Sequence, residues 1–271
     1  MENMTMAMLA GINLGIGIAL FFVLWLVSLR LRDVSFVDAF WALGMVVLAI
    51  SSLWLHAGDL ERQLVLTGLC VAWGLRLGLH LFGRWRRDGV DKRYTSLLER
   101  AGNRGLGFAT ASLLLVFLPQ SILMWMVSLP VQLGQYGAGF GALGYAGIAL
   151  AVFGIAFESL GDFQLEQFRK DPANAGQVMD RGLWRYTRHP NYFGDFCTWW
   201  GLFLITAEAP WGWLALPGPL FLSWTLLKWS GAPLLERGLA ERRPGYADYI
   251  ARTSGFFPWF PKPSANPASD G

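Results

Sequence analysis

The stretch GLWRYTRHPNYFGD (residues 182–195) runs directly into the apolar segment FCTWWGLFLIT (196–206), and this junction decides the fold. Arginines and a histidine stand where an apolar run begins, which is typical of the edge of a membrane-spanning helix. Pro190 suits the first turn of a helix, where no N–H is needed. Asp195 lies inside the apolar run, where an acid is costly without a partner or a wet cavity. The junction therefore predicts the cytoplasmic rim of a buried polar site. The less specific alternative is a basic anchor at the membrane surface.

The composition of the 271-residue chain is that of a polytopic membrane protein. Hydrophobic residues make up 54% and charged residues 15% of the chain, whereas soluble domains contain about 25% charged residues. We expect helices, because an open sheet cannot satisfy its backbone in lipid. The net charge of +3 is too small to indicate a nucleic-acid partner. Cys70 and Cys197 fall in apolar runs and show neither a disulfide pattern nor a metal-binding spacing.

Seven apolar stretches are candidates for membrane-spanning helices, which need about 20 residues. They cover residues 8–29, 34–55, 63–82, 106–131, 143–160, 192–206 and 211–229. The fifth continues as a polar, helical extension over 161–170, and Pro119 predicts a kink in the fourth. Lysine and arginine gather in alternate loops, so the positive-inside rule places the N-terminus outside and the C-terminus in the cytosol.

We therefore expect an all-α integral membrane protein, a seven-transmembrane-helix bundle of the bacterial inner membrane. Residues 1–262 form a single membrane-embedded domain, and residues 263–271 form a disordered tail rich in Pro, Ser and Asn.

Ionisable residues from five of these spans lie at one level, at or just inside the predicted cytoplasmic ends. Such residues usually face the bundle interior or a wet cavity, so their shared level predicts one polar chamber open to the cytosol. The alternative is a set of separate ion pairs that fix helix register, such as Arg76 with Asp38. The residues are Asp38, Arg76, His80, Glu158, Asp162, Asp195 and Lys228.

The spacing of these residues indicates what the chamber binds. Glu158 and Asp162 are four apart on one helix face and are followed by Arg169 and Lys170. Acids suit sugar hydroxyls or a carboxamide, and cations suit phosphates. The basic loop residues Arg86, Arg87, Lys92, Arg93 and Arg188 could add to the phosphate field, or they could serve topology alone.

Two other site classes are not favoured by the sequence. The three histidines, His56, His80 and His189, lack paired spacing, so we expect no metal site. The segment 139–144 matches GxGxxG, but that pattern is meaningful only after a strand in a βαβ unit. Here it stands at the outer entrance of a span, where it eases packing or a turn.

The 182–195 stretch, ESLGD (158–162), YADYIAR (246–252) and FFPW (256–259) together resemble the steroid 5-alpha-reductase superfamily, most closely its bacterial branch of unknown function. The resemblance covers roughly residues 30–262. It implies seven membrane helices, a cytosol-facing NADPH site in a C-terminal half of about 143–262, and reduction of the carbon–carbon double bond of a lipophilic enone, commonly a 3-oxo-4-ene steroid.

The resemblance also implies roles for individual residues. Asp162, Arg169, Tyr186, Asn191 and Asp195 match family positions that hold the nucleotide or its nicotinamide end, and Arg84 and Arg93 resemble arginines that meet phosphate. The cofactor set that we expect is completed by Glu158, Lys170, Arg188, His189 and Glu236.

The substrate side departs from the family pattern. The family polarises its substrate with a Glu on the second helix and a Tyr on the third, whereas this chain offers Asp38 and, at the third-helix match, Leu81 beside His80. We expect Asp38 to supply the proton, directly or through His80. We also expect a lipophilic substrate to enter from the bilayer between the early spans.

Two rival functions remain open. Membrane methyltransferases of the isoprenylcysteine carboxyl type use S-adenosylmethionine and share the pattern Arg-His-Pro-x-Tyr-x-Gly, which residues 188–194 match, and a late glutamate such as Glu236. The cations after Asp162 favour the reductase, because that methyl donor has no phosphate. The third reading is a non-enzymatic lipid-binding membrane protein. The oligomeric state is left open.

Overall fold

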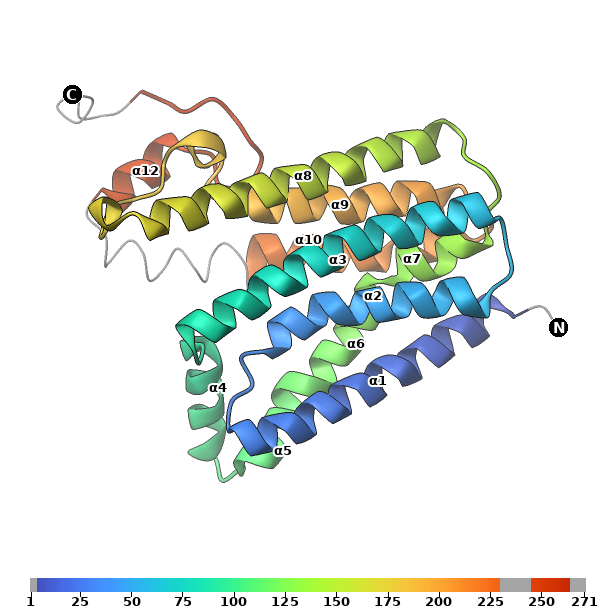
Figure 1. Cartoon of the computed structure of the whole chain (residues 1–271), viewed down its shortest axis with the longest axis horizontal. Coiled ribbons are helices and arrows are strands. Elements are labelled where there is room, and N and C mark those ends of the chain that lie inside the picture. Colours follow the sequence, from blue (N-terminus) through green and yellow to red (C-terminus); the bar gives the residue numbers. More distant parts are fainter. Residues whose placement is uncertain (1–3, 230–244, 264–271) are drawn as a thin grey trace. The chain divides into compact units, whose positions relative to one another are not determined.

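The computed structural model describes residues 4–229 and 245–263, and all regular elements in these two ranges are helical (Figure 1). The α-helices are α1 (Met6–Leu31), α2 (Val37–Leu55), α3 (Leu60–Asp88), α4 (Lys92–Gly102), α5 (Phe108–Ser112), α6 (Leu118–Val127), α7 (Leu129–Leu133), α8 (Ala142–Lys170), α9 (Pro190–Ala207), α10 (Pro217–Trp224) and α12 (Tyr246–Arg252). Short 3-10 helices cover Gly134–Tyr136, Pro172–Asn174, Gly182–Arg185 and Gly212–Ala215, and π-helical turns cover Leu113–Phe117 and Thr225–Trp229.

Within residues 4–229 and 245–263, five helical segments are long and apolar enough to cross a membrane: α1, α2, α3, the run Phe108–Val127, and α8. They coincide with the first five predicted spans, so the prediction of an all-helical membrane protein is confirmed. The sixth predicted span lies in α9, and the seventh is divided between a 3-10 helix, α10 and a π-helical turn. The number of seven spans and the orientation of the termini stay predictions.

Helix α8 continues beyond its apolar part, as the sequence predicted. It contains 29 residues, so at a rise of 1.5 Å per residue it is about 43 Å long and exceeds the hydrocarbon core of a bilayer, about 30 Å thick. The segment 161–170 is the last part of this helix. The polar residues of that segment therefore stand on a rigid element.

The fourth span is irregular next to Pro119. A π-helical turn, Leu113–Phe117, separates α5 from α6, and the N–H of Leu118 donates to the carbonyl of Leu113, five residues earlier. Proline has no N–H for the ordinary helical bond, and π turns are one recognised way in which helices absorb such an interruption. A change of helical register thus lies just before Pro119, and the predicted kink stays a prediction.

The backbone of the chain packs into two compact units. The first comprises Met1–Gly147 and Leu202–Gly218, and the second comprises Ile148–Gly201 and Pro219–Gly271. Of the described residues in the predicted cofactor half, 148–201, 219–229 and 245–262 therefore belong to the second unit. Residues 264–271, almost all of the predicted tail, lie outside the described part of the chain.

In the first unit, α2 and α3 pack with their backbones in close approach. A Cβ atom at Gly74 would lie 2.9 Å from the carbonyl oxygen of Ala42, so this position has no room for a side chain. Close approach through small residues is the usual way in which membrane helices associate. Figure 1 shows α4 turned across one end of this helix pair. The same end of the pair carries Asp38.

Arg62 fixes the other end of α3. Its guanidinium is fully buried and donates hydrogen bonds to the carbonyl oxygens of Gly134 (2.9 Å), Gly139 (2.8 Å) and Ile205. The GxGxxG segment is thus part of a hydrogen-bond network around Arg62. Gly139 adopts φ +60°, and the N–H of Gly141 donates to Glu208 at 3.0 Å. These contacts agree with reading that segment as a turn.

Candidate functional site

Asp38 is the centre of a cluster of charged and polar side chains in the first unit, which we call the Asp38 cluster: Asp38, Asp91, Arg93 and Tyr94. The guanidinium of Arg93 donates to one carboxylate oxygen of Asp38 at 3.0 Å, and the hydroxyl of Tyr94 donates to the other at 2.5 Å. Arg93 also binds Asp91 at 2.8 Å. Asp38 therefore acts as the acceptor in this cluster, and the proton of the pair is on Tyr94.

The Asp38 cluster is held in place by the loops around it. Asp91 caps α4 by accepting from the N–H of Arg93 at 2.8 Å. The N–H of Asp91 in turn donates to the hydroxyl of Ser35 at 2.8 Å, and the indole N–H of Trp85 donates to Asp33 at 2.7 Å. The turn before α2 is thus bound both to the end of α3 and to the start of α4.

A small pocket of about 90 Å³ opens beside the Asp38 cluster. It is lined by Ser35, Asp38, Leu81, Arg84, Trp85, Asp88, Gly89, Val90 and Asp91. Two residues that the sequence assigned to different roles, Asp38 to proton donation and Arg84 to phosphate binding, therefore line one pocket. Leu81, the third-helix match of the family tyrosine, lines the same pocket as Asp38.

Tyr94 is the functional candidate that sequence reasoning missed. It stands on α4, after the third span, and its hydroxyl donates to Asp38 and accepts from the amide of Gln120 at 2.9 Å. Burial and then the negative charge of Asp38 raise the pKa of the Tyr94 phenol well above its ordinary value. The phenol thus remains protonated, and its one proton serves the hydrogen bond to Asp38. Its signal in the sequence was weak: a tyrosine in a basic loop, three residues after the capping Asp91.

Arg93 has a different setting from the one expected. The sequence predicted a contact with phosphate, whereas the structure places its guanidinium between two carboxylates, Asp38 and Asp91. Burial lowers the pKa of Arg93, but the hydrogen bond and charge of these two acids outweigh it and raise the pKa above the ordinary value. Arg93 holds the Asp38 cluster together, and a phosphate contact stays a prediction.

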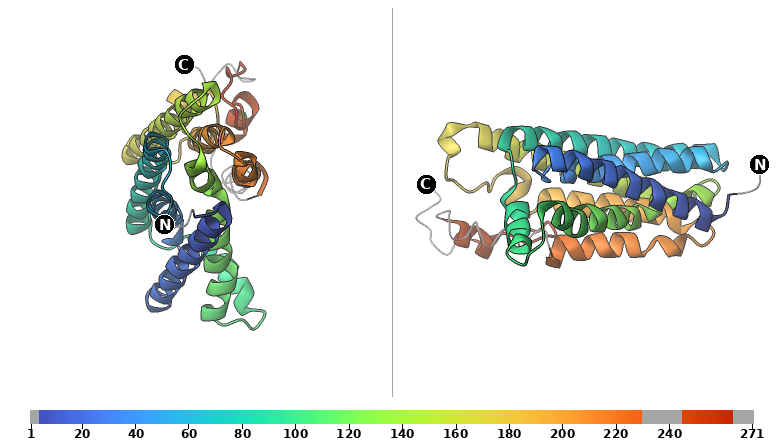
Figure 2. Two further views of the ribbon diagram at one scale, coloured as in Figure 1. Left: turned by 90° about the vertical axis from the view of Figure 1, so that its right-hand side faces the viewer. Right: turned by 90° about the horizontal axis from the view of Figure 1, so that it is seen from below.

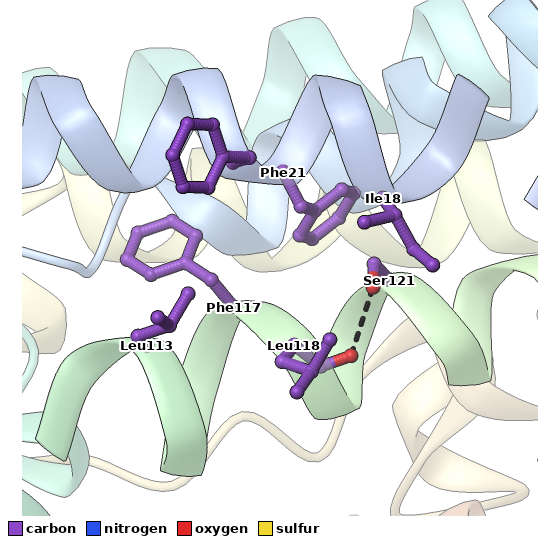
Figure 3. A pocket seen from close by; sticks show the side chains of 7 residues that line it. Ile18, Phe21, Leu113, Phe117, Leu118 and Ser121 are labelled. Carbon is purple, nitrogen blue, oxygen red and sulfur yellow. Dashed lines mark hydrogen bonds between the residues drawn. The ribbon is translucent and has the colours of Figure 1, made fainter. Parts of the chain in front are cut away.

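An apolar groove lies on the surface of the first unit, between α1 and the irregular fourth span (Figure 3). It has a volume of about 200 Å³, and its only polar lining residue, Ser121, donates its hydroxyl to the carbonyl of Leu118 at 2.8 Å. The ring of Phe117 forms its inner wall and packs against Phe36, whose centroid is 6.1 Å away. The groove is lined by Ile18, Phe21, Phe22, Leu113, Phe117, Leu118 and Ser121.

In the second unit, α8 and α9 touch backbone to backbone. A Cβ atom at Gly194 would lie 2.5 Å from the backbone nitrogen of Glu158, and one at Gly154 would lie 2.5 Å from the carbonyl oxygen of Gly194. The contact places the buried face of α8 against the first turns of α9. Three acids of the predicted site are buried at these helices: Glu158, Asp162 and Asp195, with 2%, 8% and 8% exposure.

The stretch that decides the fold is clamped between α8 and the C-terminal segment. The indole N–H of Trp184 donates to the carbonyl of Gly161 at 3.0 Å. The hydroxyl of Thr187 donates to the carbonyl of Phe256 at 2.7 Å, and that of Tyr249, on α12, donates to the carbonyl of Trp184. The motifs around 182–195 and 246–259 are therefore parts of one local structure (Figure 2).

Arg188 contributes to this clamp. Its guanidinium donates to the carbonyl oxygens of Ile250 (3.1 Å) and Thr253 (2.7 Å) at the end of α12. Its backbone N–H donates to the carbonyl of Ser254 at 2.9 Å. The sequence assigned Arg188 to the cofactor, and these contacts give it a structural role as well.

The remaining predicted cofactor residues differ in exposure. His189 is buried, and its ring stacks on Tyr192 with centroids 5.5 Å apart. Asn191 is half-buried at the start of α9, whereas Tyr186 is exposed. Arg169 and Lys170 are exposed at the end of α8, where Lys170 pairs with Glu166 at 3.3 Å. Glu236 and its neighbours 230–244 lie outside the described residues.

The predicted chamber was to unite residues of both compact units. Within the first unit the structure joins Asp38 to Arg93 and brings Arg84 to the same pocket. His80 is half-buried on α3, and the hydrogen bonds described for Asp38 run to Arg93 and Tyr94. A relay through His80 and the union of both residue groups in one chamber stay predictions.

The sequence matches the family described as "Protein of unknown function (DUF1295)" over residues 24–253. The chain belongs to this family. The matched range of the DUF1295 family contains the Asp38 cluster and the α8–α9 contact. An uncharacterized protein of Schizosaccharomyces pombe is 22% identical over 270 residues, which cover 87% of this chain and 76% of that relative. No solved structure matches the chain.

Proposed function

We propose that this DUF1295 protein is an NADPH-dependent membrane reductase that transfers a hydride to the C=C bond of a lipophilic enone. The observation that carries the proposal is the 2.5 Å hydrogen bond between Tyr94 and Asp38 beside a polar pocket. The steroid 5-alpha-reductase superfamily polarises its substrate with a Glu on the second helix and a Tyr on the third, whereas here the acid is Asp38 on α2 and the tyrosine stands on α4. The DUF1295 family is associated with proteins of that kind.

The polar and charged groups of the second unit fit NADPH by their chemistry. Buried carboxylates on α8 and α9 are acceptors suited to ribose hydroxyls and to a carboxamide. Arg169 and Lys170 are exposed cations suited to phosphate, and Arg169 follows Asp162 by seven residues on α8, which is about 10 Å along the axis. We propose that the cofactor is held by Asp162, Asp195, Asn191, Glu158, Arg169, Lys170, Tyr186, His189 and Arg188, with Arg84 at phosphate.

The protein's own groups would do the following. NADPH supplies the hydride that reaches the β-carbon of the enone. When a substrate is bound, its carbonyl oxygen, on which negative charge develops, would replace Asp38 as the acceptor of the one phenol proton of Tyr94, and the raised pKa keeps the phenol protonated until then. The α-carbon would take its new hydrogen as a proton from solvent. Asp38, fixed by Arg93, orients the phenol, so the proton donor of the proposal moves from Asp38 to Tyr94.

The apolar groove of the first unit suits the lipophilic part of the substrate. It opens between two helical segments that can cross a membrane, and it offers no unused polar group. A hydrocarbon skeleton leaving the bilayer could therefore enter there without losing hydrogen bonds. This proposal keeps the expected lateral entry between the early spans.

Turnover assays separate the reductase from its main rival. Purified protein in detergent would be incubated with NADPH and a panel of lipophilic enones, and in parallel with labelled S-adenosylmethionine and prenylated thiol acceptors. The reductase predicts enone-dependent NADPH oxidation and a saturated ketone product. Methyl transfer without NADPH oxidation would establish the methyltransferase instead. Neither activity, together with lipid binding that survives Asn191→Ala, would favour a non-enzymatic lipid-binding protein.

A further inference from the structure

Gln120 is a polar side chain in an apolar span, and it forms a hydrogen bond with Tyr94. It lies in the sequence VFLPQSILMW (116–125), where a primary amide is costly unless it finds a partner. The structure supplies one: its Nε2 lies 2.9 Å from the hydroxyl oxygen of Tyr94. The side chain is half-buried, shortly after the π-helical turn and directly after Pro119.

The direction of this hydrogen bond is fixed by the rest of the network. The phenol has a single proton, and the 2.5 Å contact with Asp38 uses it as a donor. The contact between Gln120 and Tyr94 therefore needs an N–H of the amide as donor and the phenol oxygen as acceptor. Gln120 consequently prevents the proton of Tyr94 from turning toward α6.

The π-helical turn explains why Gln120 can reach Tyr94. A π turn adds a residue to one helical turn, so all positions after Leu113–Phe117 are rotated relative to a continuous α-helix. Such turns occur often at functional sites. Here the rotated segment presents Gln120 to α4, while Phe117 faces Phe36 on the α2 side.

We propose that Gln120 is a positioning residue for the reduction, which holds the phenol oxygen of Tyr94 in place while its one proton changes acceptor, from Asp38 to the carbonyl oxygen of the substrate. This inference rests on the proposed reductase function. As negative charge develops on the substrate oxygen, the phenol shares its proton more fully and its own oxygen gains charge. The N–H of Gln120 stabilises that charge. No bond to Gln120 forms or breaks.

The charged and polar groups that surround Tyr94 come from three elements. Asp38 on α2 accepts its proton, Arg93 on α4 lies beside it with a cation–π distance of 5.8 Å, and Gln120 on α6 donates to its oxygen. Gln120 is the neutral member of this set. Its replacement by an acid would therefore add a second titrating group next to Asp38.

Two variants test the proposal in the reductase assay. Gln120→Leu keeps the approximate size but removes the donor, and we expect kcat to fall about tenfold with KM and NADPH affinity unchanged. Gln120→Glu can donate only while its carboxyl is protonated. Its kcat should therefore be near the wild-type value on the acid side and should fall as the carboxyl ionises, whereas wild-type kcat stays level over that range.

The results distinguish this inference from the proposed function. Wild-type turnover with unchanged kcat in Gln120→Leu, or with a level pH profile in Gln120→Glu, would overturn the role of Gln120 and leave the reductase intact. No NADPH-dependent turnover in the wild type would overturn the reductase and the catalytic role of Gln120 together. The titration of a ¹³Cζ-labelled Tyr94, assigned with Tyr94→Phe, then decides whether Gln120 orients the phenol at all. A shift to higher pH in Gln120→Leu supports the contact, and an unchanged titration refutes it.

Discussion

Tyr94→Phe removes one hydroxyl from the centre of the proposed site and leaves the ring. The change deletes the 2.5 Å hydrogen bond to Asp38 and the 2.9 Å hydrogen bond from Gln120. Arg93 still holds the second carboxylate oxygen of Asp38 at 3.0 Å. The α4 helix keeps its cap at Asp91. The helix should therefore stay in place while the donor is lost.

The expected cost in stability is modest. A hydrogen bond to a charged acceptor is worth about 1.5–3 kcal/mol. The Asp38 side chain is 25% exposed, however, so water can replace part of what is lost. We expect the free energy of unfolding to fall by about 1–2 kcal/mol. The loss in turnover should be larger, because removal of one donor to a developing oxyanion lowers kcat by about 10²–10³.

The measurements are kcat and KM for an enone with saturating NADPH, and denaturant unfolding in detergent micelles. Tyr145→Phe is the matched control, since Tyr145 is 63% exposed and should lose neither activity nor stability. The wild-type profile should show no alkaline loss of kcat from Tyr94 below about pH 10, because its pKa lies well above its ordinary value of 10.0. Wild-type kcat in Tyr94→Phe, with the expected loss of stability, would refute the catalytic role.

Two further variants test how the units are built. Arg62→Met removes the guanidinium donor from three carbonyl groups, two of them in buried hydrogen bonds, and should lower the free energy of unfolding by about 3 kcal/mol, whereas Arg86→Met, at an exposed position, should not. An unchanged free energy of unfolding in Arg62→Met would contradict the stabilising role of the hydrogen-bond network around Arg62. Gly194→Ala forces a methyl group to within 2.5 Å of the backbone of α8 and should cost about 1–3 kcal/mol and abolish NADPH binding, while Gly68→Ala, with open space around it, should be tolerated. Normal cofactor affinity in Gly194→Ala would show that the α8–α9 contact does not position the site.

Much of the fold followed from hydropathy, because the bilayer leaves few alternatives to a helix. The first five spans and the helical extension of α8 were predicted within a few residues. The run 211–229 was harder. Its glycines and prolines divide it into a 3-10 helix, α10 and a π-helical turn, and a hydropathy average does not register such breaks.

The site was predictable where its residues follow a regular spacing, and less so where loops bring them together. Asp38 was identified because an acid in an apolar span is costly unless it has a partner or a wet cavity. Tyr94 was missed because its meeting with Asp38 depends on the turn at Asp91 and on the docking of α4, which no helical period encodes. Gln120 was missed because a π-helical turn shifts the register after Phe117.

Calorimetric titration of the purified protein with NADPH, NADH and S-adenosylmethionine measures directly whether the proposed NADPH site exists. It should be made with the wild type, with Asp195→Ala and with Glu99→Gln as a control for the loss of an exposed acid. We expect selective binding of NADPH to the wild type and to Glu99→Gln, and no binding to Asp195→Ala. Binding of S-adenosylmethionine alone, or undiminished NADPH binding in Asp195→Ala, would contradict it.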